Sequence, residues 1–276
     1  MPSKRIGKQT VKMLKPPSIV GYASVVGKKE GEGPLGGSFD YINEDTTFGE
    51  KTWEKSESRM QKEATERALK KAGLTYDKLD YIMAGDLINQ CIASSFAARE
   101  SEVPFVGLYG ACSTMAEGLA MSSMLIDGGF SGLSAAVASS HYCTAERQYR
   151  TPLEYGAQRT PTAQWTVTGS GAVILSEEGP GPYITYATMG KIVDLGVKDA
   201  NNMGAAMAGA AYDTINRHLF ATGTSPADYD VIYTGDLGQV GSELMCELFR
   251  RDGTEISHKH KDCGLMLYDR EKQDVH

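Results

Sequence analysis

The stretch RALKKAGLTYDKLDYIMAGDL at residues 67–87 returns as RHLFATGTSPADYDVIYTGDL at residues 217–237. The two segments align without a gap at an offset of 150 residues, and both end in Gly-Asp-Leu. Solenoid repeats recur every 20–50 residues or so, so a period this long indicates a different architecture. It predicts two fused copies of one folding unit that pack as a pseudo-dimer.

Each copy has the pattern of an amphipathic helix, a short loop and a buried strand. The apolar residues fall on one helical face in both copies: Trp53, Met60, Ala64 and Ala68 in the first, and Ala208, Ala211, Ile215 and Leu219 in the second. Gly73 and Gly223 end the two helices, because glycine readily adopts the left-handed conformation. The runs 81–84 and 231–234 are typical of interior strands.

The remaining segments extend this α/β pattern and predict two domains, 1–178 and 179–276. In the first, we expect strands at 106–109, 133–138 and 166–175, and a helix from the turn 110–114 to about residue 126. In the second, we expect a strand at 183–189, a helix at 241–250 and a strand at 264–268. The second copy then lacks a helix and two strands, so we interpret the C-terminal half as truncated.

The composition excludes several classes of protein. A net charge of −7 argues against nucleic-acid binding, which requires clustered basic surface. The chain has no apolar run of about 18 residues and no signal-peptide pattern, so we expect an intracellular protein without a transmembrane segment. Its five cysteines include no CxxC pair, which predicts neither a disulfide framework nor a metal site.

Cys112 is the candidate functional cysteine because it follows a predicted strand, at the start of a helix, in Gly110-Ala111-Cys112-Ser113-Thr114. Unpaired N–H groups and the helix dipole at such a position favour a thiolate. The small residues before it leave room for a ligand. The alternative is that Cys112 only packs beneath the helix start.

His141 is the candidate partner of this cysteine, since catalysis by cysteine usually needs a nearby histidine. It follows the predicted strand 133–138 after Ser139 and Ser140. The ends of strands are where α/β proteins bind ligands. His218 is expected on a solvated helix surface, and His258 and His260 in a charged loop. A structural hydrogen bond is an equally good interpretation of His141.

Polar residues in two further segments are candidate ligand contacts. Arg147 and Arg150, with Arg159 beyond them, could clamp a carboxylate, or pair with Glu146 and Glu154 instead. Asp86 and Asn89 follow the strand 81–84. Because Asp236 occupies the same Gly-Asp-Leu context, Asp86 could equally cap the helix that follows.

Eight blocks of the sequence together resemble the stage V sporulation protein AD family of the thiolase-like superfamily. They are GEGPLGGSFD (31–40), AGDLINQ (84–90), GLYGACSTM (107–115), SSHYCTAERQYR (139–150), WTVTGSGAVILS (165–176), VDLGVKDANNMGAAMA (193–208), YTGDLGQVGS (233–242) and DCGLMLY (262–268). The resemblance covers nearly the whole chain and implies a thiolase-like fold of two duplicated mixed-sheet α/β halves. It places Cys112 where condensing enzymes carry their nucleophile.

The resemblance also implies a function. Members of this family bind dipicolinic acid (pyridine-2,6-dicarboxylate) and assist its uptake into the developing spore with membrane-embedded proteins of the same operon. We therefore expect a non-catalytic protein at the inner spore membrane, a dipicolinate site formed by Asp86, Asn89, Cys112, His141, Arg147 and Arg150, and no cofactor except a Ca²⁺ ion accompanying the ligand. We also expect a homodimer formed through the sheet of the first half, at 133–138. The alternatives are an acyltransferase or ketoacyl synthase with Cys112 as nucleophile, and a purely structural subunit.

Overall fold

The computed structural model describes residues 4–149, 160 and 162–275. The described chain divides into two compact units. The larger unit contains residues 13–149 and 166–185, and the smaller contains 4–12, 160, 162–165 and 186–275. The predicted boundary after residue 178 falls within the last segment of the larger unit.

The larger unit is built on a six-stranded sheet in the order β3-β2-β7-β6-β4-β5. Its strands are β2 (Ser18–Gly27), β3 (Tyr41–Asn43), β4 (Tyr81–Gly85), β5 (Phe105–Gly107), β6 (Leu133–Ser140) and β7 (Gly169–Ser176). β7 is antiparallel to both of its neighbours, whereas β4 is parallel to β5 and β6. The sheet is therefore mixed, as the resemblance to the thiolase-like superfamily implies.

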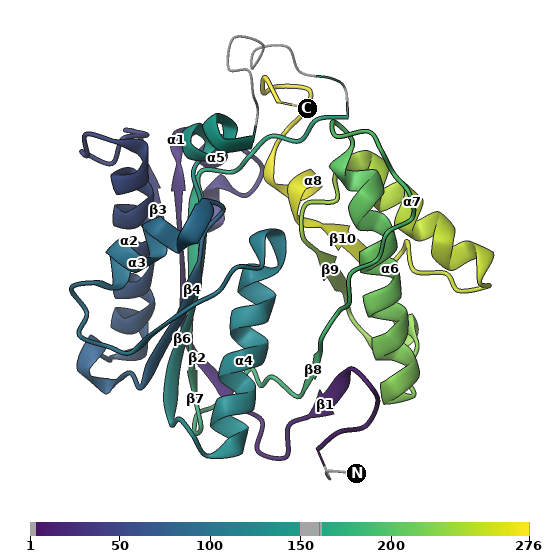
Figure 1. Ribbon diagram of the computed structural model, residues 1–276, viewed down its shortest axis with the longest axis horizontal. Helices are drawn as coiled ribbons and strands as arrows, with labels where there is room; N and C mark the ends of the chain where they lie inside the picture. The colour runs from purple at the N-terminus through teal and green to yellow at the C-terminus, as the bar shows by residue number, and fades with distance from the viewer. Residues whose placement is uncertain (1–3, 150–159, 161, 276) are drawn as a thin grey trace. The chain divides into compact units, whose positions relative to one another are not determined.

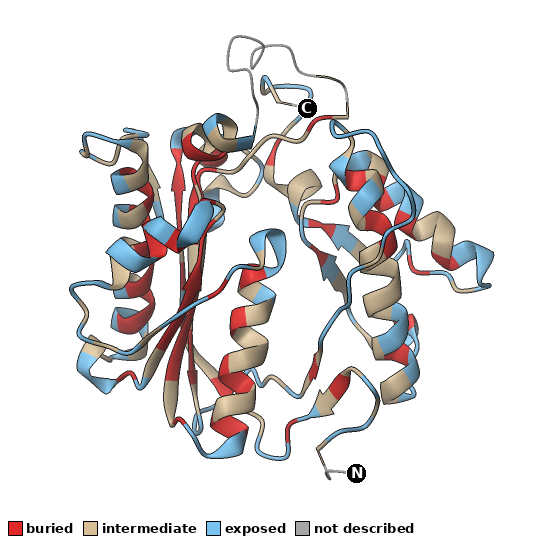
Figure 2. Ribbon diagram, in the orientation of Figure 1, coloured by how far each residue is buried: buried red, intermediate tan, exposed pale blue. Residues whose placement is uncertain are grey.

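Helices cover both faces of this sheet. The described helices of the larger unit are α1 (Lys28–Gly31), α2 (Trp53–Ala72), α3 (Ile92–Ala98), α4 (Thr114–Gly128) and α5 (Tyr142–Tyr149), of which α2, α3 and α4 cover the faces. Figure 1 shows α2 and α3 on one face and α4 on the other. Successive residues of a strand point to opposite faces, so Ala135 and Val137 pack in the cluster of α2 while Ala136 packs with Ile126 of α4. The four inner strands β2, β7, β6 and β4 accordingly carry the buried residues of the sheet (Figure 2), whereas the edge strands β3 and β5 have none.

The smaller unit contains two short sheets and three helices. β1 (Thr10–Lys12) pairs antiparallel with β8 (Tyr186–Thr188), and β9 (Ile232–Thr234) pairs parallel with β10 (His260–Asp262). The helices are α6 (Met203–Thr222), α7 (Gly238–Arg251) and α8 (Cys263–Leu267). Met245 and Phe249 of α7 are fully buried in the core that α6 and α7 share.

The predicted duplication is confirmed by the geometry of α2 and α6. Each helix has 20 residues and ends at a glycine with positive φ, 69° at Gly73 and 70° at Gly223. The side chains of Thr52 and Asn202 cap the two N-termini by accepting from the backbone of Lys55 and Ala205. Short 3-10 turns follow at Tyr76–Lys78 and Pro226–Asp228, again 150 residues apart.

One prediction about an individual segment is wrong, and the structure restricts a second. Residues 264–268 were expected to form a strand, but α8 occupies this stretch because the side chain of Asp262 accepts a hydrogen bond from Leu265 N at 3.1 Å and caps a helix. The expected dimer segment, 133–138, belongs to β6, which is hydrogen-bonded on both sides to β4 and β7. An interior strand has no free edge with which to pair a second copy.

Candidate functional site

Two loops at the carboxyl ends of β4 and β5 form the candidate site. Each contains a short 3-10 turn, Asn89–Cys91 after β4 and Ala111–Ser113 after β5. Of the five described non-glycine residues with positive φ, three lie in these turns: Gln90 at 64°, Cys91 at 50° and Ala111 at 45°. Such conformations cost free energy and are often retained at binding sites.

Cys112 lies where the sequence predicts, at the start of a helix. It is exposed, in the turn directly before α4, which begins at Thr114. Thr114 itself is 2% exposed, and its hydroxyl oxygen is buried with no hydrogen-bond partner in the described part of the chain. The helix start therefore combines an exposed cysteine with a buried hydroxyl that has no partner among the described residues.

Two tyrosines and an amide connect the loops. Tyr109 donates to Asn89 Oδ1 at 2.8 Å, and Tyr149 donates to the carbonyl oxygen of Leu87. Burial raises the pKa of Tyr149, and the charges of Tyr109, Cys112, Asp86 and Glu57 raise it further. Asn89, Tyr109, Cys112 and Tyr149 therefore belong to one site, although Tyr109 and Tyr149 had no assigned role in the sequence analysis.

Asp86 is held within the fold beneath these loops. It is 3% exposed, and its carboxylate accepts from Ile88 N at 3.0 Å, Ser94 N at 2.8 Å and Ser94 Oγ at 2.6 Å. Ser94 lies in the first turn of α3, so Asp86 caps that helix. The structure thus gives Asp86 the capping role left open as the alternative, and its ligand-binding role stays a prediction.

His141 is also engaged within the fold. Its ring is 1% exposed, Cys143 N donates to its Nδ1 at 3.2 Å, and its Nε2 lies 2.9 Å from the carbonyl oxygen of Thr46. An Nδ1 that accepts requires a proton on Nε2, which then donates to Thr46. Burial lowers the pKa of His141, so the ring is neutral at pH 7. This geometry supports a structural role for His141.

Arg147 forms an ion pair with Glu54 of α2, and Glu154, one of its predicted partners, lies outside the described residues. Its side chain is 52% exposed, so the guanidinium still reaches solvent beside the candidate site. Arg150 and Arg159 lie outside the described residues.

A buried polar network that the sequence patterns did not predict lies under the loops. Glu57 of α2 is 0% exposed and accepts from Ser139 Oγ and Thr144 Oγ1, both at 2.8 Å. Burial raises the pKa of Glu57 to about 7. The signal was present in the sequence, since Glu57 falls between Trp53 and Met60 on the buried helical stripe.

His218 and His260 are held by hydrogen bonds within the smaller unit. His218 contacts Thr188 and Tyr229, and His260 contacts Thr234, so both are part-buried rather than on the surface as expected. Burial lowers the pKa of each. Over residues 4–149, 160 and 162–275, no three His, Cys, Asp or Glu side chains are grouped to hold a metal ion. Nor is any helix in this part of the chain long and apolar enough to cross a membrane.

Solved structures of low sequence identity share this fold. The H285N variant of Xanthomonas campestris OleA with cerulenin gives a TM-score of 0.63 at 11% identity, covering 92% of this chain and 83% of that one. The 3-oxoacyl-(acyl carrier protein) synthase III of Xanthomonas oryzae gives 0.60 at 16% identity, covering 89% and 84%. At these identities the likeness shows the fold alone, which is thiolase-like.

Sequence comparison gives the family. The model of the family "Stage V sporulation protein AD (SpoVAD)" matches residues 7–276. A relative of that name from Bacillus subtilis (strain 168) is 44% identical over 270 residues, which cover 98% of this chain and 80% of the relative. The chain belongs to the stage V sporulation protein AD family.

Proposed function

We propose that this protein binds dipicolinic acid and assists its uptake into the developing spore without catalysing a condensation. Family membership supports the role in sporulation. The observation that carries the binding proposal is the group of hydrogen-bonding residues around Cys112, at the carboxyl ends of β4 and β5.

The chemistry of this site suits a flat aromatic dicarboxylate. The start of α4 offers backbone N–H groups and the positive end of a 15-residue helix dipole. Asn89, Tyr109 and Tyr149 add polar side chains, and Arg147 lies in the next helix. Gly110 and Ala111, the two residues before the exposed Cys112, are small.

Nearby acidic side chains would repel a dianion bound at this site. Asp86 and Glu57 are buried close enough to Tyr149 to raise its pKa. Because the oxygens of Asp86 already accept three hydrogen bonds, we propose that it acts without contacting the ligand. A Ca²⁺ ion accompanying dipicolinate would then be held mainly by the carboxylates of the ligand, since hard cations prefer oxygen.

Calorimetric titration with dipicolinate tests the proposal. We expect saturable binding that weakens in Cys112→Ala and Asn89→Ala. Cys263→Ala is the matched control, because Cys263 is also exposed at a helix start but lies in the smaller unit. Absence of heat, with no competition against a labelled ligand, would contradict the proposal.

An acyltransferase remains the second candidate, because Cys112 is exposed at the start of a helix as a nucleophile requires. The neutral ring of His141 is engaged by Thr46 and Cys143, which counts against it as the base. Incubation with acyl-CoA thioesters discriminates the two functions. A stable mass increase on Cys112, absent in Cys112→Ala, would favour the enzyme.

We also propose partners for this protein. β5 has no strand partner on its outer side among the described residues, and Val106 and Tyr109 are exposed beside it, so a second copy could pair there. Val106→Lys should then lower the mass measured by sedimentation.

We further propose that membrane-embedded proteins of the same operon hold the protein at the inner spore membrane. Loss of this location when those proteins are deleted is the test.

A further inference from the structure

The helices α2 and α6 occupy the same place in the two copies but differ at two positions that are buried in α2 and half-buried in α6. Glu57 and Gln61 of α2 correspond, at the offset of 150, to Met207 and Ala211 of α6. Met207 and Ala211 pack against the apolar core of the smaller unit. The repeated fold therefore forms with apolar side chains at these positions, and the buried carboxyl and amide of α2 need another explanation.

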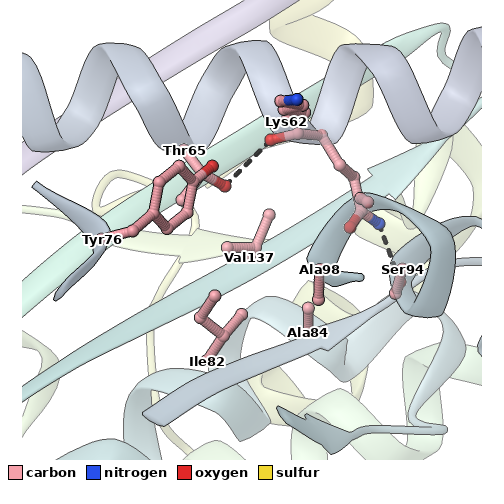
Figure 3. Close-up of a pocket in the computed structure, with 10 residues that line it drawn as sticks. Lys62, Thr65, Tyr76, Ile82, Ala84, Ser94, Ala98 and Val137 are labelled. Carbon is pink, nitrogen blue, oxygen red and sulfur yellow. Dashed lines mark hydrogen bonds between the residues drawn. The ribbon is translucent and has the colours of Figure 1, made fainter. Parts of the chain in front are cut away.

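Gln61 joins two carboxyl groups through two serines. Its Nε2 lies 2.7 Å from Ser139 Oγ and 2.8 Å from Ser94 Oγ. Ser139 donates to Glu57 and Ser94 donates to Asp86, so hydrogen bonds run without a break from one carboxyl group to the other. A cavity of about 10 Å³ beside Gln61 and Ser94, seen in Figure 3, has room for about one water molecule.

Glu57 can be satisfied in both of its protonation states. When it is ionised, Ser139 and Thr144 donate to its two oxygens. When it is protonated, it can donate to Thr144 Oγ1, because that hydroxyl also lies 2.9 Å from the carbonyl oxygen of His141 and can turn to donate there. A rotation of one hydroxyl thus allows a proton to bind without leaving a buried group unpaired.

The charged groups around Glu57 give it no cation as a direct partner in the described residues. Asp86, at the end of β4, is the charge that acts on it, and its effect is repulsive. On α5, Arg147 is paired with Glu54, and on α2 itself Lys62 is paired with Glu100. His141 is neutral, and Tyr149 is un-ionised at pH 7 because its pKa is raised.

We propose that Glu57 is a proton-binding site linked to anion binding at the Cys112 loops, so that dipicolinate binds with uptake of a proton. The linkage rests on the proposed function. The reason for the linkage is that the hydrogen-bond network contacts two elements of the candidate site. These are the Asp86–Cys91 loop, which carries Asn89, and α5, which carries Tyr149. A dianion bound there disfavours a charge on Glu57, and by reciprocity a neutral Glu57 strengthens binding of the dianion.

Dipicolinate affinity as a function of pH tests the linkage. Carboxyl groups of the ligand ionise near pH 4 and stay ionised from pH 6 to pH 8. Over this range we expect the affinity of the wild type to fall about three- to tenfold. Glu57→Gln, which keeps the shape of the neutral side chain, should change less than about twofold. Glu63→Gln is the control, because Glu63 lies on the same helix and pairs with Arg67 near solvent.

The pH dependence of unfolding tests the proton site without any ligand. The pKa of Glu57 rises from 4.5 to about 7 on folding, so its stabilising contribution is complete below pH 4.5 and is lost as pH rises through about 7. Glu57→Gln should flatten the curve between pH 5 and pH 8. Ser139→Ala removes a donor to the charged form and should move the loss to higher pH.

The outcomes separate the two proposals. Equal pH dependence of unfolding in Glu57→Gln and wild type would overturn the proton site. A flattened unfolding curve together with dipicolinate affinity that depends equally on pH in both proteins would overturn the linkage. No dipicolinate binding at any pH would contradict the proposed function and the linkage with it, while the unfolding result would still decide the proton site.

Discussion

The two strand-end aspartates, Asp86 and Asp236, share one sequence context but have different surroundings. Asp86 accepts three hydrogen bonds from Ile88 and Ser94 and caps α3. In the smaller unit Asp262 performs the corresponding task, accepting from Thr234 Oγ1 at 2.9 Å and Leu237 N at 2.8 Å. Asp236 instead lines a cavity of about 40 Å³, and burial raises its pKa to about 6. A shared motif therefore fixes backbone position but not the role of its side chain.

The largest expected effect comes from removing the carboxylates that hold loops. Asp86→Ala and Asp262→Ala should each cost about 3 kcal/mol of unfolding free energy, because several buried donors lose their acceptor. Asp236→Ala should cost less than about 1 kcal/mol. Amide hydrogen exchange, measured separately in the two units, gives these values. Similar losses for Asp86→Ala and Asp236→Ala would break the comparison.

The next effect is the pH dependence of Asp236. Its pKa rises from 3.8 to about 6 on folding, so its contribution to stability is complete below pH 3.8 and is lost as pH rises through about 6. A rise of about two units corresponds to about 3 kcal/mol, so with partial solvent screening Asp236→Asn should stabilise the smaller unit by about 2 kcal/mol at pH 8 and have no such effect near pH 4. Urea unfolding at both pH values measures this. A variant less stable than the wild type at pH 8 would show that the charged carboxylate makes favourable contacts.

The smallest expected effect concerns a feature that the two copies share, the glycine that ends α2 and α6. A Cβ at Gly73 or Gly223 would contact nothing within 4 Å, so Gly73→Ala and Gly223→Ala should cost only the strain of positive φ, about 1 kcal/mol each. Equal losses are expected, since the two φ angles are 69° and 70°. Thermal unfolding of both variants checks this, and unequal losses would argue against equivalent helix ends.

The sequence predicted features that depend on local patterns. Gly73 and Gly223 end their helices, and Cys112 stands at the start of α4, because turn geometry and helical periodicity are encoded within about 20 residues. The Asp262 cap was also readable, since Asp precedes the Cys-Gly-Leu start of α8, but the apolar run 264–268 favoured a strand instead.

Features built from distant residues were not predictable from one sequence. Glu57 meets Ser139 and Thr144 across 82 and 87 residues, and no local pattern marks those pairs. The order of strands that places β6 inside the sheet is likewise a property of the whole fold. The one local signal for the network that we identify is the polar residue Glu57 on the otherwise apolar buried face of α2.

Calorimetric titration of dipicolinate into the wild type, Cys112→Ala and Asp236→Asn tests most directly whether the first copy carries the binding site. We expect saturable binding to the wild type, weaker binding to Cys112→Ala and unchanged binding to Asp236→Asn. Unchanged binding to Cys112→Ala with loss in Asp236→Asn would place the site in the second copy and contradict this account.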